Sequence, residues 1–188
     1  MYKLVKLEDI VRIPPDRFKD DQKEVVTDIL REQYEGKWDK ELGMVLCVQD
    51  VLEIGEGRVI HGDGASYNNV TFNVLTFLPK LHEVIEGHVV EIVEFGVFVR
   101  IGPVDALAHV SQITNDYISY DKKQHTLTGK ETKHVIKEGD YVRARIVTLS
   151  TKEEVVKVGL TMRQPYLGKI EWIDEEKKKT QEKKEEKK

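Results

Sequence analysis

The chain has 188 residues, of which 34% are charged, and it carries a net charge of −4 and a single cysteine. This length allows one large or two small domains with proper hydrophobic cores. Cys47 alone excludes a disulfide framework and a cysteine-rich zinc site, and no apolar run approaches the ~18 residues that span a membrane. The acidic balance excludes a protein that holds nucleic acid through a uniformly basic surface, so any such contact must be local.

The first half of the chain predicts a small α+β domain. Its pattern indicates, in order, a strand or a bent pair of strands over residues 1–13, a helix over residues 20–34, and strands over residues 43–54 and 70–78. Pro14 and Pro15 end the first segment, because proline supplies no donor to a strand ladder. Gly36 is the expected stop of the helix.

A glycine-rich segment that contains Gly55, Gly57, Gly62, Asp63 and Gly64 lies between the last two of these strands. It is not a phosphate-binding loop, because Asp63 rather than lysine follows Gly62, and the third glycine of a dinucleotide fingerprint is missing. Two tight turns around a short strand over residues 58–61 explain the glycines instead. Such turns let the backbone approach a partner closely.

The second half predicts four or five short strands bounded by turn residues, the clearest over residues 87–93, 95–101, 139–147 and 155–163. Five short strands with this punctuation are typical of an OB barrel, whose sheet face binds oligonucleotides. The expected fold class is therefore α+β, with an N-terminal α+β domain followed by a C-terminal five-stranded OB-fold β-barrel.

In the strand over residues 95–101, the aromatic ring of Phe98 lies on the face that is expected to point to water. Its β-branched residues share one face by the two-residue period, and Phe98 and Arg100 share the other. A ring beside a cation suits single-stranded nucleic acid, which offers bases to stack and phosphates to pair. A core strand with one exposed phenylalanine fits the spacing equally well. Phe95 reaches the face of Phe98 only if Gly96 forms a bulge.

Later strands add cations at positions that face outward. Alternation places Arg143, Arg145 and Lys157 on the solvent side of their strands. Together with Phe98 and Arg100 they are candidates for an RNA-binding surface, and the alternation leaves open whether all five lie on one patch.

Residues 84–163 resemble the RNA-binding domain named after ribosomal protein S-one. The matching motifs are Gly87-x-Val89, Phe95-Gly96-x-Phe98-Val99, His109-x-Ser111-x-Ile113, Gly139-Asp140-x-Val142 and Leu160-Thr161-Met162-Arg163. In that family both aromatics, the histidine before the serine, and polar residues near the last strands contact RNA. The resemblance therefore implies RNA contacts for Phe95, Phe98, His109 and Lys157. Ser150 stands where many members carry an acidic residue.

Residues 1–165 as a whole resemble the family of the archaeal RNA polymerase subunit called E-prime, which is homologous to the seventh subunit of eukaryotic RNA polymerase II. The matching segments are Met1-Tyr2-Lys3-Leu4, the run from Asp9 to Pro15, the loop ending in Gly62-Asp63-Gly64, Phe77-x-Pro79, the stretch from Gly87 to His109, and an insertion over residues 117–137. This resemblance implies that the chain is a subunit of a stalk on the RNA polymerase. Residues 1–81 would dock on the polymerase core through the glycine-rich loop, and residues 82–165 would reach emerging single-stranded RNA. A second stalk subunit, called F in archaea, would pack beside both domains.

Catalytic constellations are missing from the sequence. None of the six histidines has a metal-ligand spacing with a nearby acid, and no acid is positioned to orient His109 toward Ser111. We therefore expect no enzymatic activity, no metal and no cofactor in this chain.

Residues 166–188 are expected to form a charged tail that is partly helical or disordered. The N-terminus has no signal-peptide core, so the expected location is cytoplasmic, without a membrane partner. The leading interpretation is a non-catalytic polymerase stalk subunit that binds RNA. The alternative is an RNA-binding accessory factor of translation or of the exosome.

Overall fold

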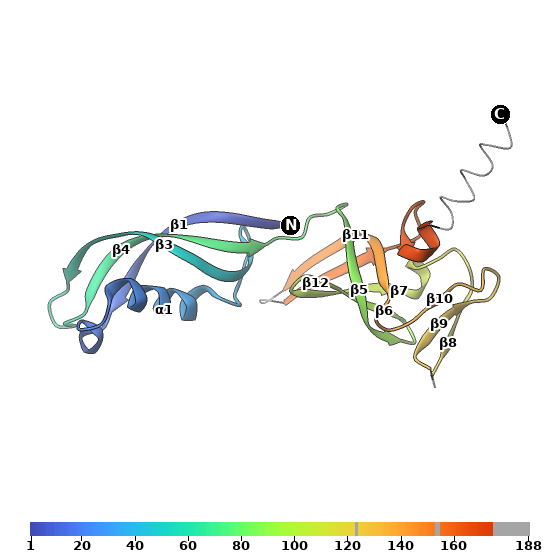
Figure 1. Cartoon of the computed structure of the whole chain (residues 1–188), viewed down its shortest axis with the longest axis horizontal. Helices are drawn as coiled ribbons and strands as arrows, with labels where there is room; N and C mark the ends of the chain where they lie inside the picture. Colours follow the sequence, from blue (N-terminus) through green and yellow to red (C-terminus); the bar gives the residue numbers. More distant parts are fainter. Residues whose placement is uncertain (123, 153–154, 175–188) are drawn as a thin grey trace, which may run out of the picture. The chain divides into compact units, whose positions relative to one another are not determined.

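The computed structural model describes residues 1–122, 124–152 and 155–174. The chain divides into two compact units, of which the first comprises Met1–Leu78 and the second begins at Pro79 (Figure 1). The sequence pattern predicts a boundary three residues later, between residues 81 and 82. In the described part of the chain, no helix is long and apolar enough to cross a membrane.

The first unit is built on a four-stranded antiparallel sheet. Its strands lie in the order β1 (Tyr2–Ile13), β4 (Ser66–Phe77), β3 (Gly43–Val59) and β2 (Trp38–Asp39). β1 pairs with β4 without interruption from Tyr2 opposite Phe77 to Ile13 opposite Ser66. The start of the chain is therefore one long strand and not a bent pair. A short 3-10 helix, η1 (Pro15–Arg17), follows at the paired prolines.

The predicted helix is confirmed as α1 (Gln22–Tyr34), which covers one face of this sheet (Figure 1). The carboxylate of Asp21 caps its first turn by accepting the backbone N–H of Lys23 at 2.7 Å. Gly36 follows the last turn with a φ of 75°, a conformation that glycine adopts without a steric penalty. Burial of apolar side chains between helix and sheet stabilises the unit. The core contains Val26 and Leu30 of the helix with Val11, Val48, Val70, Phe72 and Val74 of the sheet.

Within this unit, α1 leaves the opposite face of the sheet uncovered. The even-numbered residues of β1 point to that face, and Tyr2, Leu4 and Ile10 are each more than half exposed. Leu4 lies opposite Leu75 of β4, so apolar side chains of two strands meet there. Lys6 and Glu8 lie between Leu4 and Ile10 on this face. Exposed apolar side chains on a sheet are a common mark of a surface that another protein covers.

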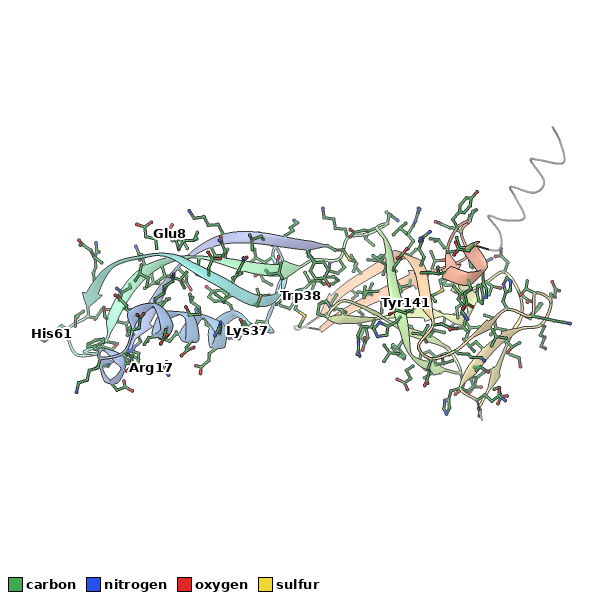
Figure 2. All side chains as sticks on the ribbon, viewed as in Figure 1. Glu8, Arg17, Lys37, Trp38, His61 and Tyr141 are labelled. Atoms are coloured by element: carbon green, nitrogen blue, oxygen red, sulfur yellow. The ribbon has the colours of Figure 1, made fainter. Side chains whose placement is uncertain are left out.

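The glycine-rich segment forms one long hairpin, so the expectation of two turns around a short strand was wrong. β3 continues through Gly55 and Gly57 to Val59, and irregular pairing with β4 accommodates both glycines. A Cβ atom on Gly57 would lie 2.2 Å from the Oγ atom of Ser66. The turn itself comprises residues 60–65, and His61 within it is labelled in Figure 2. β3 therefore continues beyond Gly55 and Gly57, because β4 pairs with it along nearly its whole length.

The second unit confirms the predicted five-stranded barrel. Its strands are β5 (Val84–Val93), β6 (Gly96–Ile101), β7 (Val104–His109), β11 (Tyr141–Lys152) and β12 (Val155–Thr161). They lie in the order β12-β7-β6-β5-β11, and pairing of β11 with β12 closes the barrel. A 3-10 helix, η2 (Val110–Gln112), follows β7. The barrel core contains Val89, Ile92, Val97, Val99, Ile101, Ala106, Val142, Ala144, Ile146, Val158 and Leu160.

Two additions extend this barrel. The insertion before β11 forms a small antiparallel sheet of β8 (Ile118–Asp121), β9 (Thr126–Gly129) and β10 (Val135–Ile136). After the barrel, β13 (Gly168–Lys169) pairs with β11, and residues 170–174 are helical, with Ile173 buried. Part of the expected tail therefore packs on the unit, whereas residues 175–188 lie outside the described residues.

Candidate nucleic-acid interface

Phe98 and Arg100 lie on the outer face of β6, as the alternation predicts. Their neighbours Val97, Val99 and Ile101 point into the barrel and are at most 1% exposed. Pairing with β7 sets Phe98 opposite Leu107 and Arg100 opposite Asp105. Phe98 is half-buried and does not belong to the barrel core.

Phe95 meets Phe98 by means of a turn and not by means of a bulge. Val93 of β5 pairs directly with Gly96 of β6, so Glu94 and Phe95 form the two-residue connection between the strands. Phe95 is 52% exposed, and the centroid of its ring lies 6.3 Å from that of Phe98 in an edge-to-face arrangement. The bulge expected at Gly96 is absent; the irregular pairing of β5 with β6 lies between Val89 and Glu91.

Gly96 is required for a different reason. A Cβ atom at this position would lie 2.4 Å from the backbone oxygen of Ala108. Only glycine permits this close approach of β6 to β7. Gly96 therefore lets β6 lie close to β7, while Phe95, which precedes it, stays exposed.

A groove of about 900 Å³ lies beside Phe98 and is lined by residues of β7, β11 and β12. Most of its lining is apolar, and the charged residues that line it are Asp105 and Lys157. The described residues that line it are Phe98, Asp105, Leu107, His109, Gln112, Val147, Thr148, Ser150, Val156, Lys157, Val158, Gly159 and Leu160. Mostly apolar walls with a few polar groups are typical of a site that holds flat, partly polar ligands such as nucleobases.

His109 is held in a fixed orientation at one end of the groove. It precedes η2, and its Nδ1 atom accepts the backbone N–H of Ser111 at 3.2 Å. The same atom lies 2.9 Å from the hydroxyl oxygen of Ser111. When Nδ1 accepts a hydrogen bond, the neutral ring carries its proton on Nε2. The pair found as His109-x-Ser111 in the sequence thus positions an imidazole donor.

The predicted cations separate into three groups. Lys157 lines the groove. Arg100 lies at its edge and forms a two-pronged ion pair with Asp105, with Nε to Oδ1 at 2.8 Å and Nη2 to Oδ2 at 3.0 Å. Arg143 and Arg145 lie where β11 pairs with β5, outside the groove lining. Arg143 is bound to Glu86 at 2.6 Å. RNA contacts by these two arginines stay a prediction.

The sequence interpretation missed two polar residues, one in the groove lining and one bonded to η2. Asp105 faces Arg100 only because the turn at Gly102 sets the register of β6 with β7. Arg163 donates from Nε to the side-chain oxygen of Asn115 at 2.6 Å and from Nη1 to the backbone oxygen of Ser111. Arg163 belongs to the last-strand motif, but the sequence has no signal that places its side chain against Ser111.

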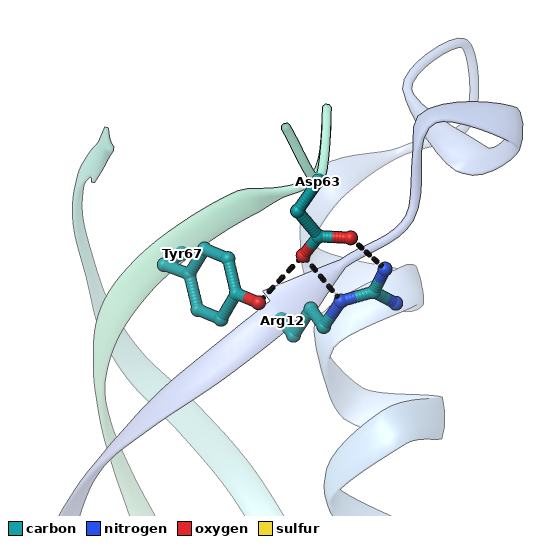
Figure 3. A network of polar contacts seen from close by, with 3 residues as sticks. All are labelled: Arg12, Asp63 and Tyr67. Carbon is teal, nitrogen blue, oxygen red and sulfur yellow. Dashed lines mark hydrogen bonds and ion pairs between the residues drawn. The ribbon is translucent and has the colours of Figure 1, made fainter. Parts of the chain in front are cut away.

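A second candidate surface is the hairpin turn of the first unit. Gly62 and Gly64 have φ values of 97° and 70°, a region in which glycine has no steric penalty. Between them, Asp63 accepts hydrogen bonds from Arg12 of β1 at 2.6 and 2.9 Å and from the hydroxyl of Tyr67 at 2.6 Å (Figure 3). These hydrogen bonds, chiefly that from Arg12, lower the pKa of Asp63 to about 2. The charged carboxylate therefore fastens the turn to β1 throughout the physiological pH range.

Among the described residues, no group of three or more His, Cys, Asp or Glu side chains is placed to hold a metal ion.

Comparison with protein families divides the chain in the same way as the fold. Residues 8–64 match the SHS2 domain found in the N terminus of Rpb7p/Rpc25p/MJ0397, and residues 78–152 match the S1 RNA binding domain. The protein is thus a two-domain protein in which an SHS2 domain precedes an S1-type OB barrel.

Similarity to individual proteins extends over nearly the whole chain. The DNA-directed RNA polymerase subunit Rpo7 of Saccharolobus shibatae is 45% identical over 180 residues, which cover 95% of this chain and 100% of that protein. The same subunit of Sulfolobus acidocaldarius is 45% identical over 94% of this chain and 97% of that protein. The DNA-directed RNA polymerase II subunit RPB7 of Saccharomyces cerevisiae is 24% identical over 85% of this chain and 94% of that protein.

The chain belongs to the family of the DNA-directed RNA polymerase subunit Rpo7. It is a non-catalytic stalk subunit of a DNA-directed RNA polymerase complex. This finding confirms the leading interpretation of the sequence over an accessory factor of translation or of the exosome.

Proposed function

We propose that this polymerase subunit binds emerging single-stranded RNA in the groove of its barrel. The observation that carries the proposal is the convergence of Phe98, His109 and Lys157 on one mostly apolar groove, with Phe95 edge-on to Phe98. These residue types supply a stacking platform, a hydrogen-bond donor and a phosphate contact. Their combination is typical of surfaces that bind single-stranded nucleic acid.

Single strands fit this groove better than duplexes do. Stacking on Phe98 requires a base whose face is free, and bases in a duplex are already stacked on their neighbours. The groove also lacks the dense positive charge that holds a duplex by its phosphates, since Lys157 is its one lining cation among the described residues.

Replacing Lys157 with alanine tests the proposal. We expect weaker binding of a short oligouridine to the full-length chain. We also expect the log–log salt slope, which is the slope of log binding constant against log salt concentration, to be shallower by about 0.7 because one phosphate contact is lost. Fluorescence anisotropy over a salt series measures both quantities. The matched variant is Arg143→Ala, which removes the same charge outside the groove lining.

A fall in affinity for Lys157→Ala alone confines RNA to the groove. Equal falls for both variants extend the bound surface to Arg143, where β11 pairs with β5. Unchanged affinity and slope for Lys157→Ala contradict the groove as the RNA site.

We also propose that the hairpin turn of the first unit docks on the polymerase core subunits. The turn combines a rigid backbone, held by Arg12, Asp63 and Tyr67, with exposed apolar side chains at Val59 and Ile60. Such a preorganised apolar tip loses little entropy on binding. Assembly with the polymerase core in an archaeal cell implies that this subunit is cytoplasmic.

The uncovered sheet face of the first unit suits the second stalk subunit, called F in archaea. Tyr2, Leu4 and Ile10 present exposed apolar area there, and burial of such area drives association. We propose a one-to-one heterodimer in which this second stalk subunit covers the face.

Leu4→Asp tests that pairing. We expect the variant to lose co-sedimentation with the second stalk subunit, because a buried unpaired carboxylate is costly at an interface. Phe18→Asp is the matched control, since Phe18 is exposed to a similar degree, at 51% against 58%, but lies between η1 and α1 and not on the uncovered sheet face. Pairing of Leu4→Asp that equals the wild type places the interface elsewhere.

A further inference from the structure

The edge of the groove carries an arginine whose charge is cancelled by its cross-strand neighbour. Arg100 and Asp105 face each other in the register of β6 and β7, and their side chains meet in two parallel hydrogen bonds of 2.8 and 3.0 Å. Fork-to-fork pairing of this kind holds both groups in a defined geometry. Asp105 also lines the groove itself.

We propose that Asp105 determines the binding mode of the groove: by neutralising Arg100 it makes the part of the groove beside Phe98 hold RNA through stacked bases and leaves Lys157 as the phosphate contact. The inference rests on the proposed function and adds what part of the RNA the site recognises. It assigns Asp105, which contacts Arg100 and faces the groove, the role of a specificity-determining residue.

The charges of the groove support this assignment. Of the described residues that line it, Lys157 is positive and Asp105 is negative, so the charges of this described lining cancel. A phosphate that approaches Arg100 also approaches the carboxylate of Asp105, and these two negatively charged groups repel each other. The apolar wall beside Phe98 and Leu107 has no such penalty for a base.

The carboxylate stays charged when RNA is absent. The hydrogen bond from Arg100 lowers the pKa of Asp105, and His88, which lies opposite Arg100 on β5, lowers it further. Both partners of the pair are about half exposed, with side-chain exposures of 46% and 43%. An exposed ion pair is weak enough to open, so removal of the negative charge leaves Arg100 free to reach a phosphate.

Asp105→Asn is the direct test in the full-length chain. Asparagine keeps the shape and removes the charge, so we expect tighter binding of a short oligouridine and a log–log salt slope that is steeper by about 0.7, the value for one phosphate contact. Between about 50 and 200 mM salt, this slope makes the advantage of the variant fall about 2.6-fold. Anisotropy titrations measure both changes, and the melting temperature checks the fold.

Glu86→Gln is the matched control. Glu86 holds Arg143 in an equivalent ion pair on the same barrel, outside the groove lining. Both substitutions raise the net charge by one, so a general electrostatic effect raises RNA affinity equally in the two variants. An equal rise overturns the proposal, and a rise in Asp105→Asn alone supports it.

Arg100→Ala completes a double-mutant cycle. We expect a small loss of RNA affinity in the wild-type background, where Arg100 is occupied by Asp105, and a larger loss, which cancels the whole gain, in the Asp105→Asn background. Additive effects overturn the proposal. The outcome is distinct from failure of the proposed function: if the wild type binds RNA through Phe98 and Lys157 while Asp105→Asn changes nothing, the RNA site stands and the role of Asp105 falls. If neither the wild type nor Asp105→Asn binds RNA, both are contradicted.

Discussion

Replacing Phe98 with alanine is expected to weaken RNA binding by roughly 1–3 kcal/mol for each base that stacks on the ring. This loss corresponds to a fall in affinity of about fivefold to more than a hundredfold. The fold should survive, because Phe98 is half-buried on the outer face of β6 while the barrel core is filled by Val97, Val99 and Ile101. RNA anisotropy and thermal melting on the same sample measure the two effects separately.

Phe98→Tyr is the control for this prediction, since it keeps a ring of the same size and should retain most of the affinity. A buried phenylalanine would instead lose about 3–5 kcal/mol of folding stability on truncation. RNA affinity lost only together with the folded barrel would therefore make Phe98 a core residue. A stably folded Phe98→Ala protein with undiminished affinity would remove Phe98 from the site.

Replacing Gly62 with valine is expected to weaken assembly with the polymerase core by about tenfold or more. Gly62 has a φ of 97° and no atom within 4 Å of the place of a Cβ, so the substitution introduces backbone strain without a steric clash. Strain of this kind costs roughly 1–3 kcal/mol, and the turn can relieve it only by changing the shape that docks. Competition for core enzyme between variant and wild type measures the effect.

Gly36→Val is the control for this prediction, because it introduces similar backbone strain outside the hairpin turn. Gly36 has a φ of 75° and equally open surroundings, but it lies after α1 and away from the turn. Core assembly should be near normal for Gly36→Val, and RNA binding near normal for both variants. Loss of RNA binding with normal core assembly in Gly62→Val would contradict the assignment of the turn to docking.

Local patterns predicted the elements of this fold because each element has a local physical cause. The helix follows from an acidic cap, apolar residues at helical spacing and Gly36, all of which act within a few residues. Alternation correctly set the outward direction of Phe98, Arg100 and Arg143, since the two-residue period of a strand is fixed by its backbone. It also predicts that Arg145 faces solvent, whereas its Nε atom is buried. The family resemblance then supplied the order and roles of the domains.

What sequence patterns missed depends on pairing between segments. The position of Phe95 was assigned to a bulge because parity within one strand was the only guide, whereas the observed cause is a two-residue turn between β5 and β6. Arg143 and Arg145 lie beside β5 and not in the groove, and no pattern within β11 shows which neighbour it pairs with. The partner of Arg100 was missed for the same reason, since Asp105 is placed by the register of β6 with β7.

RNA capture by the barrel is the central claim, and crosslinking in a transcribing polymerase tests it most directly. Nascent RNA that carries a photoreactive uridine would be crosslinked in complexes assembled with the wild-type chain or with Phe98→Ala, and the attached peptides mapped. We expect crosslinks within residues 95–112 and 147–160, which contain the groove lining, and their loss in Phe98→Ala. Crosslinks that are absent from this chain, or that fall outside the groove and are unchanged by Phe98→Ala, would contradict the account.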